Sequence, residues 1–314
     1  METMLKTDFY REISANKWRS FALMFVFALV VLGLGYVLGL AWGNPYFGFT
    51  LAFIVSLVMA WVSYYWSDSI VLAISRAQPA DEHEFAQLHN VVEEMALAAG
   101  LPKPRVYVID DPAPNAFATG RDPEHSVICA TTGLLRLVNR NELQGVIAHE
   151  MSHVRNYDVR FQTIAVVLAG VIILMSDWLL RSMFFGRRRG RDSRGANPAM
   201  LIILVIGIVF AILSPFIAQL LKMAISRRRE YLADASAVEL TRYPDGLADA
   251  LTKLARNGRP MQDANRATAH LFIVTPLRES GFDRLFSTHP PIEDRIARLR
   301  AMDLGDAHEP LQSR

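Results

Sequence analysis

The residues with the clearest chemical meaning are His149, Glu150 and His153, which stand in the order His-Glu-Met-Ser-His. Residues four apart on an α-helix differ by about 40° around its axis, so both imidazoles can reach one ion. Glu150 lies beside them, where its carboxylate can take a proton from a water molecule that the ion activates. The motif therefore predicts a zinc site on a helix, with Glu150 as the catalytic base.

The third zinc ligand is predicted by the acidic residues that follow. A catalytic zinc ion keeps three protein ligands and an open position. The metzincin class requires a glycine three residues after His153 and a histidine six residues after it, and Asn156 and Val159 occupy these positions instead. A His/His/Glu set is the other common arrangement, and the next glutamate after Glu150 is Glu230. We therefore expect Glu230 to complete the site.

Asp234 follows Glu230 by four residues and shares its helical face. Its carboxylate could accept the N–H group of a ligand histidine, an arrangement common around zinc. An exposed helix carboxylate is the alternative for this residue.

Two non-proteolytic readings remain as alternatives. A structural zinc site would need a fourth protein ligand, and the single cysteine, Cys129, lies away from the motif. A metal transporter would need ligands inside its membrane spans, where Asp177 is the one acidic residue.

The composition indicates what must position these residues. Charged residues make up 20% of the chain, against about 25% in an average protein. The deficit is concentrated in three stretches that together hold one charged residue, Asp177; these are Phe21–Trp66, Thr163–Leu180 and Pro198–Leu221. This pattern excludes a wholly soluble enzyme, a disordered chain and a disulfide-stapled scaffold. The net charge of +2 gives no indication of nucleic-acid binding.

About four transmembrane helices are expected. Phe21–Trp42 and Phe47–Trp66 are each long enough to cross a bilayer, and Gly43-Asn44-Pro45 between them is a turn signal. Four basic residues precede the first span, which places the N-terminus and the polar body on the cytoplasmic side; they are Lys6, Arg11, Lys17 and Arg19. Six arginines between the third and fourth spans conflict with this count, so whether those two stretches cross fully stays open; they are Arg181, Arg187, Arg188, Arg189, Arg191 and Arg194.

The polar body has the pattern of helices beside a small sheet. We expect helices at Asp81–Ala99, from an N-cap at Asn141, and at Ile292–Met302. Arg105–Asp110 and Ser126–Ala130 are of strand type, and the prolines between them suit an edge strand. Asn257–Leu277 has no clear periodicity and could form a lid. The fold class is thus an α+β membrane protein, mostly α, with a small edge-exposed sheet.

The motif His149–His153 with Asn156 and Asp158, followed by Ser226-Arg227-Arg228-Arg229-Glu230-Tyr231 and Asp234, resembles the HtpX branch of membrane zinc metalloproteases, which is related to the type-1 CAAX prenyl protease. The resemblance covers nearly the whole chain. It implies a zincin-like (gluzincin) protease domain with one Zn²⁺ per chain, in a multi-pass protein of the bacterial inner membrane whose active site faces the cytoplasm. The expected substrates are misfolded or damaged membrane proteins.

Two further matches carry over from the resemblance. Asn115-Ala116-Phe117-Ala118 is similar to the family's active-site edge strand, whose backbone would pair with an extended substrate; an ordinary proline-flanked edge is the alternative. His289 and Arg295 match positions near the zinc, where they would help to hold an oxyanion. The alternative is that His289 and Pro290 simply begin the C-terminal helix.

The expected organisation divides the protease domain around a membrane hairpin. CAAX-type processing of prenylated peptides remains an alternative function, although four spans cannot build the larger enzyme's chamber. The expected segments are a cytoplasmic N-terminal segment (1–20), a transmembrane hairpin (21–66), the first half of the protease domain (67–160), a second hairpin (161–222) and the second half of the protease domain (223–314).

Overall fold

The computed structural model of the chain describes residues 2–41, 43–168, 227–262, 268–276 and 290–302. These residues form two compact units. The apolar unit contains residues up to 74, 119–121 and 156–168. The polar unit contains 75–118, 122–155 and the described residues from 227 onward.

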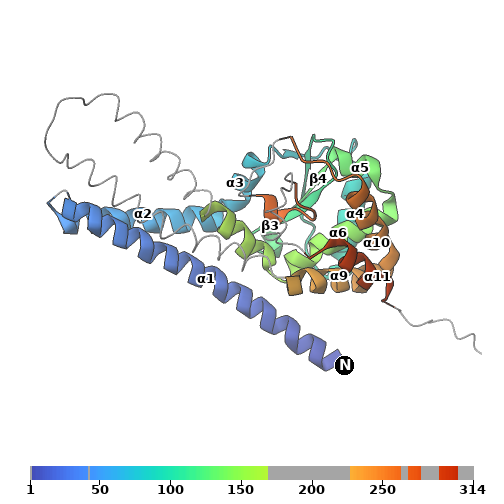
Figure 1. Cartoon of the computed structure of the whole chain (residues 1–314), viewed down its shortest axis with the longest axis horizontal. Coiled ribbons are helices and arrows are strands. Elements are labelled where there is room, and N and C mark those ends of the chain that lie inside the picture. Colours follow the sequence, from blue (N-terminus) through green and yellow to red (C-terminus); the bar gives the residue numbers. More distant parts are fainter. Residues whose placement is uncertain (1, 42, 169–226, 263–267, 277–289, 303–314) are drawn as a thin grey trace, which may run out of the picture. The chain divides into compact units, whose positions relative to one another are not determined.

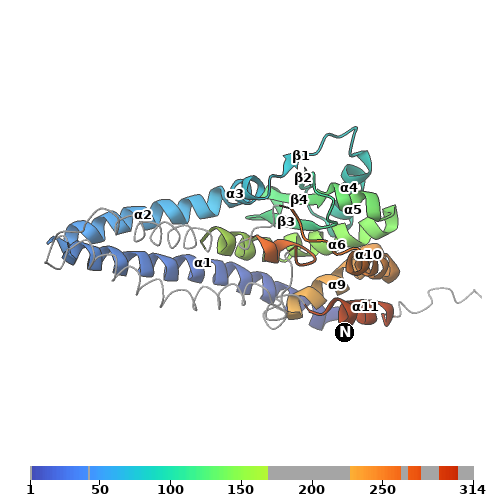
Figure 2. The ribbon, with the colours of Figure 1, turned by 45° about the horizontal axis from the view of Figure 1, so that its top comes forward.

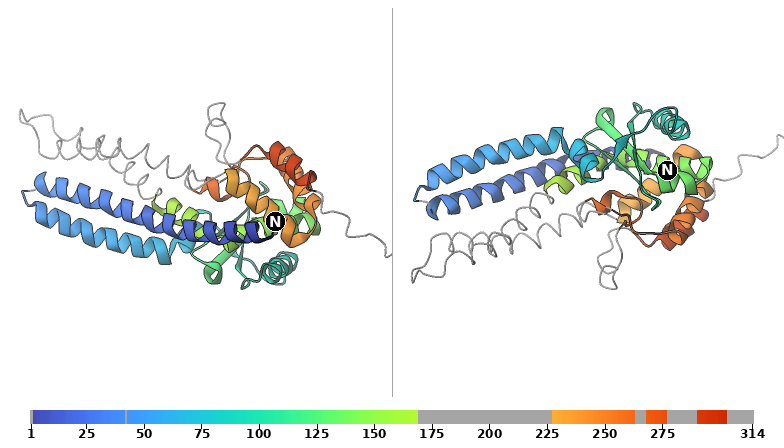
Figure 3. Two further views of the ribbon diagram at one scale, coloured as in Figure 1. Left: turned by 90° about the horizontal axis from the view of Figure 1, so that it is seen from below. Right: turned by 90° about the horizontal axis from the view of Figure 1, so that it is seen from above.

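Two long helices, α1 (Glu2–Ala41) and α2 (Pro45–Tyr65), form a hairpin in the apolar unit (Figures 1 and 3). The predicted turn separates them: Gly43 has a φ of 78°, and the Asn44 side chain accepts a hydrogen bond from the Phe47 amide at 3.0 Å. A proline at the first helical position suits this start, because its missing N–H has no partner there in any helix. The short helix α3 (Ser67–Ile74) follows α2.

Small residues bring the two helices into close contact. A Cβ atom added to Gly35 would lie 2.1 Å from the Cβ of Ala52 and 2.6 Å from the carbonyl oxygen of Gly48. Ser14–Gly33 and Pro45–Tyr65 are long and apolar enough to cross a membrane, and most of each stretch is not buried within the protein. Such apolar outer faces suit contact with lipid.

Residues 158–168 are helical and begin the third predicted span. The fully buried Asn16 of α1 ties this helix to the hairpin, because its side-chain amide donates to Asp158 Oδ1 at 2.7 Å and to the Asn156 carbonyl at 3.0 Å. The rest of the third span, the whole fourth span, the arginine-rich loop between them and Asp177 lie outside the described residues.

The described strands form one small mixed sheet in the order β1-β2-β4-β3 (Figure 2). β1 pairs antiparallel with β2, and β2 pairs parallel with β4. β3 therefore lies at an edge, as the flanking prolines predict. β2 and β4 match the predicted strands to within one residue at their C-terminal ends. The strands are β1 (Gln78–Pro79), β2 (Arg105–Ile109), β3 (Ala116–Gly120) and β4 (Ser126–Thr131).

Helices make up most of the polar unit (Figure 1). Among the described residues they are α4 (Ala86–Ala99), the 3-10 turn η1 (Pro123–His125), α5 (Thr132–Leu137), α6 (Arg140–Arg155), α9 (Arg227–Thr241), α10 (Pro244–Arg256), the 3-10 turn η2 (Ala269–Leu271) and α11 (Ile292–Arg300).

Two predicted helix starts are wrong, and local hydrogen bonds explain both. α4 begins at Ala86 because the Asp81 carboxylate accepts the amides of residues 83 and 84, which folds this stretch into a turn. α6 is capped by Asn139: its side chain accepts the Glu142 amide at 3.0 Å, and the Glu142 carboxylate accepts the Asn139 amide at 2.7 Å. This reciprocal pair is a capping box, so the predicted cap, Asn141, already lies inside the helix.

Candidate metal centre

The three predicted metal ligands come together between two helices that pack on each other, α6 and α9. His149 and His153 lie one turn apart on α6, with perpendicular rings whose centroids are 4.9 Å apart. Glu230, on the first turn of α9, places one carboxylate oxygen 3.8 Å from His149 Nε2 and the other 3.6 Å from His153 Nε2. All three side chains are buried.

This donor set fits a zinc ion. One ligand atom from each residue lies within 4.8 Å of the others, a spacing that bonds of about 2.0–2.2 Å to a shared ion can bridge. Burial lowers the pKa of His149, which favours the neutral imidazole that a metal requires. A second cluster within the described residues, Asp122, Glu124 and His125, is largely exposed, and exposed acidic clusters are common without an ion.

Asp234 lies behind the site, one turn after Glu230 on α9. Its Oδ1 is 3.0 Å from His149 Nδ1, so it can hold the ring with the other nitrogen facing the ion. Burial alone would raise the pKa of Asp234, but the Arg295 guanidinium and the hydrogen bond to His149 outweigh it, and the pKa is lowered. Asp234 is therefore a buried carboxylate and not an exposed one.

Arg295, on α11, is the partner that keeps Asp234 ionised. Its Nε donates to Asp234 Oδ2 at 2.9 Å and its Nη2 donates to Oδ1 at 2.7 Å, while only 1% of the residue is exposed. A two-bonded guanidinium of this kind fixes the carboxylate in place. These contacts indicate a positioning role for Arg295 toward Asp234, and its contact with an oxyanion stays a prediction. The other residue predicted for that contact, His289, lies outside the described residues.

Glu150 projects from α6 beside the edge strand. Its carboxylate is buried, and burial raises its pKa from 4.5 to about 7, although His153 and the Ala118 backbone amide act in the opposite direction. A group with a pKa near 7 can both accept and return a proton at neutral pH. The structure thus places the predicted base next to β3.

The outer edge of β3 is already occupied where we expected substrate. The carbonyl of Asn115 accepts the Thr131 amide of β4 at 2.9 Å, so the next carbonyl, of Ala116, points to the free side. There it accepts the amide of Ile273 at 2.9 Å. The Asn115 side chain also bonds the backbone of Val274. We call residues 268–276 the strap.

This contact between residues 268–276 and the edge strand was not predicted from the sequence. The run Leu271-Phe272-Ile273-Val274 followed by Thr275-Pro276 is a strand-type signal. It lies within the stretch that we expected to be a lid, and it could have indicated an extended segment.

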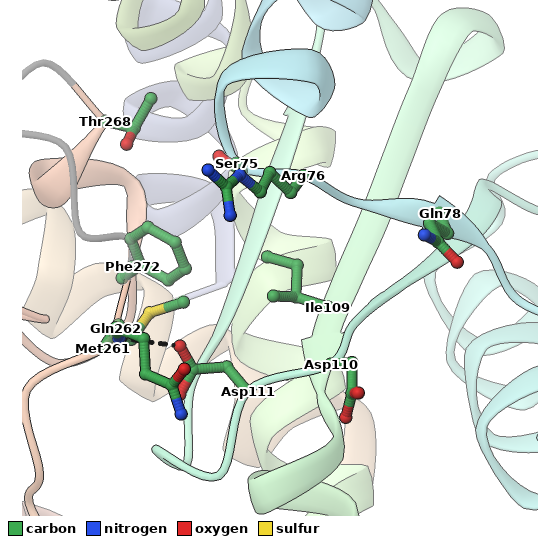
Figure 4. A pocket seen from close by; sticks show the side chains of 10 residues that line it. All are labelled: Ser75, Arg76, Gln78, Ile109, Asp110, Asp111, Met261, Gln262, Thr268 and Phe272. Atoms are coloured by element: carbon green, nitrogen blue, oxygen red, sulfur yellow. Dashed lines mark hydrogen bonds between the residues drawn. The ribbon is translucent and has the colours of Figure 1, made fainter.

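A cavity of about 300 Å³ lies at the base of the strap (Figure 4). The main-chain amide of Gln262 donates to Asp111 Oδ2 at 2.9 Å, and both residues line the cavity. Thr268 and Phe272 of the strap line it as well. None of the three metal ligands lines it, so it is separate from the metal centre. Its lining residues are Ser75, Arg76, Gln78, Ile109, Asp110, Asp111, Met261, Gln262, Thr268 and Phe272.

Comparisons with known proteins place this chain in a family. The chain is 49% identical over 294 residues to "Protease HtpX homolog" of Dictyoglomus thermophilum, covering 94% of this chain and 95% of the relative. It is 46% identical over 307 residues to the protein of the same name from Thermoanaerobacter pseudethanolicus, covering 96% and 100%. The crystal structure of S. mikatae Ste24p is similar with a TM-score of 0.49 and 19% identity, covering 92% of this chain and 67% of that one. A profile described as "Peptidase family M48" matches residues 82–303, a range that includes the three predicted metal ligands and Glu150, and the chain belongs to this family.

Proposed function

We propose that this chain is a zinc-dependent membrane endopeptidase that cleaves peptide bonds of misfolded or damaged membrane proteins. The observation that carries the proposal is the buried convergence of His149, His153 and Glu230 with Glu150 beside them. The name of the relatives, "Protease HtpX homolog", supports proteolysis, and the apolar hairpin supports a place in the membrane.

The residues of the centre have different roles in hydrolysis. His149, His153 and Glu230 would hold the metal, which when bound polarises the scissile carbonyl and lowers the pKa of water. Glu150 takes a proton from the attacking water and delivers it to the leaving nitrogen. Asp234 keeps the His149 ring in the orientation that a ligand needs.

Four spans, a zincin-like arrangement of the protease domain and a position in the bacterial inner membrane belong to the same proposal. The polar unit, with its site, would face the cytoplasm, because basic residues precede the first span. The partners would be unfolded or membrane protein substrates and the lipid bilayer. Cleavage of a prenylated peptide in preference to an unfolded protein would instead favour CAAX-type processing.

Two substitutions in the full chain, purified in detergent, test the proposal. Glu150→Gln should keep about one zinc per chain while losing cleavage of casein, since Gln cannot accept the proton. Glu230→Ala should lose the metal. Glu239→Ala, an exposed position on the same helix, is the control and should retain both. Cleavage by Glu150→Gln, or full zinc occupancy in Glu230→Ala, would contradict the assignment.

A further inference from the structure

The strap follows the free edge of β3 in the manner of a bound peptide. The Ile273 amide donates to the Ala116 carbonyl at 2.9 Å. One residue earlier in the strap, the ring of Phe272 packs on that of Phe117, with centroids 4.9 Å apart. One step forward in the strap therefore matches one step back in β3, so the two segments run antiparallel.

The next position continues the same register. The Asn115 side chain donates to the Val274 carbonyl at 2.8 Å and accepts the Val274 amide at 3.3 Å. An asparagine side chain thus takes both main-chain groups of one strap residue. The bond from Ile273 to Ala116 joins main chain to main chain, and pairing of that kind is how an exposed sheet edge binds an extended peptide.

The strap also contacts the machinery of the metal centre. Arg295 Nη1 donates to the Ile273 carbonyl at 3.3 Å and lies 3.8 Å from a carboxylate oxygen of the ligand Glu230. Both main-chain groups of Ile273 are therefore held, one by the edge strand and one by the arginine that fixes Asp234. This residue lies where the backbone of a substrate would pass.

The strap leaves the edge before it reaches the base. Continuing the register would place Leu271 opposite Ala118, whose amide bonds the Glu150 carboxylate. Instead, Ala269–Leu271 turn away as the 3-10 turn η2. The strap therefore covers the part of the edge at Asn115–Phe117 and presents no extended peptide bond beside Glu150, which explains how it can lie at the site without being cut.

We propose that residues 272–274 are a built-in pseudosubstrate that occupies the Asn115–Phe117 part of the substrate-binding edge and must be displaced before a substrate strand can pair there. This inference rests on the proposed endopeptidase function. Phe272 and Ile273 are 2% and 3% exposed, so the site that they fill selects extended segments with aromatic or branched aliphatic side chains. Such segments are typical of unfolded membrane and core sequences.

An internal competitor has a specific kinetic signature. While the strap is seated, a substrate must first replace it, so the apparent KM equals the intrinsic KM divided by the fraction of chains whose edge is free. At saturating substrate the strap is displaced, and kcat is unaffected. Weakening the strap should therefore lower KM and leave kcat unchanged.

Ile273→Pro is the substitution that tests this. Proline has no N–H and cannot bond the Ala116 carbonyl. The preceding residue, Phe272, has φ −75° and ψ 144°, a conformation that a residue before proline adopts readily. Ile273→Val is the matched variant, because it keeps the N–H group and the β-branched shape.

With casein as substrate, the KM of Ile273→Pro should fall by up to roughly tenfold, the value of one main-chain hydrogen bond, with kcat and zinc content kept. Ile273→Val should shift KM less. An unchanged or raised KM in the proline variant would show that the strap is a fixed wall of the site, and the pseudosubstrate would be rejected. If the wild-type chain cleaves casein and only this result fails, the proposed function stands; if the wild-type zinc form does not cleave, both fall.

A second measurement covers a proline variant that fails to fold or to bind zinc. Amide hydrogen exchange of residues 271–274 is followed in the zinc-loaded Glu150→Gln chain with and without saturating casein. Protection of the Ile273 amide should be lost when casein is bound. Protection that persists or increases would overturn the inference.

Discussion

Replacement of Arg295 by methionine distinguishes a positioning role from a substrate contact. The variant keeps an unbranched side chain of similar length but removes both bonds to Asp234, at 2.9 and 2.7 Å. The Asp234 carboxylate is only 3% exposed, so it would remain buried without its counter-charge. Removing one partner of a buried ion pair costs about 3–5 kcal/mol. We expect a loss of this size in the stability of the metal-free chain.

The metal centre should weaken as well. Without Arg295 the pKa of Asp234 rises, because burial then acts without its largest opposing charge. A protonated Asp234 holds His149 less firmly, and losing such an outer contact typically lowers metal affinity about 10- to 100-fold. Zinc affinity is measured by competition with a chelator, and stability by thermal unfolding of the metal-free protein in the same detergent.

The double variant Arg295→Met/Asp234→Leu supplies the control. It removes both charges, and an apolar replacement of a buried ion pair is often neutral in stability. The double variant should therefore unfold at a higher temperature than Arg295→Met alone, although its zinc affinity stays low. If Arg295→Met instead keeps its stability and zinc affinity and loses only kcat, Arg295 acts on the substrate and the positioning role is refuted.

Three further outcomes follow from the geometry. Gly35→Leu should lower the free energy of unfolding by about 1–3 kcal/mol, because the added side chain collides with α2. Gly33→Leu is the control and should not lower it, because nothing lies within 4 Å of the added Cβ. Asn139→Ala should cost about 1 kcal/mol through loss of the capping box, and Asn141→Ala, inside the helix, should cost less in the same unfolding assay. Burial raises the folded pKa of Glu150 to about 7, so the metal-free chain loses stability as pH rises from about 4.5 through about 7. Metal-free Glu150→Gln should therefore be more stable than the wild type by roughly 3 kcal/mol at about pH 8 and equal to it below about pH 4.5; equal melting temperatures at both pH values would contradict this.

The features that could be predicted from the sequence are those that depend on residue spacing within one helix or strand. The spacing of His149 and His153 determines that both lie on one helical face, whatever the surrounding fold. The first residue of a helix was harder to predict. Asp81 before α4 and Asn139 before α6 each accept backbone amides two or three residues further along the chain, and such a bond changes where the helix begins. Several polar residues near a helix start offer the same chemistry, and the backbone path selects among them.

Contacts between residues far apart in the chain could not be predicted in this way. Arg295 was expected near the zinc, but its partner Asp234 lies on another helix, and no spacing rule relates the two. The pairing of Ile273 with Ala116 is of the same kind. An edge strand has unpaired groups that any extended segment can bond, so the sequence of the edge does not identify its occupant.

The number of residues between His153 and Glu230 has little effect on the free energy of bringing these two side chains together. The cost of bringing two chain segments together grows only slowly with the length between them, by about 0.6 kcal/mol for each doubling. What brings the ligands together is the packing of α6 on α9 within the polar unit, where small residues such as Ala233 and Ala237 on α9 are fully buried. Elimination by residue type leads to Glu230 as the candidate third ligand, because the chemistry of zinc restricts the candidates even when distance along the chain does not, and its carboxylate lies within 4.8 Å of the ligand atoms of both histidines.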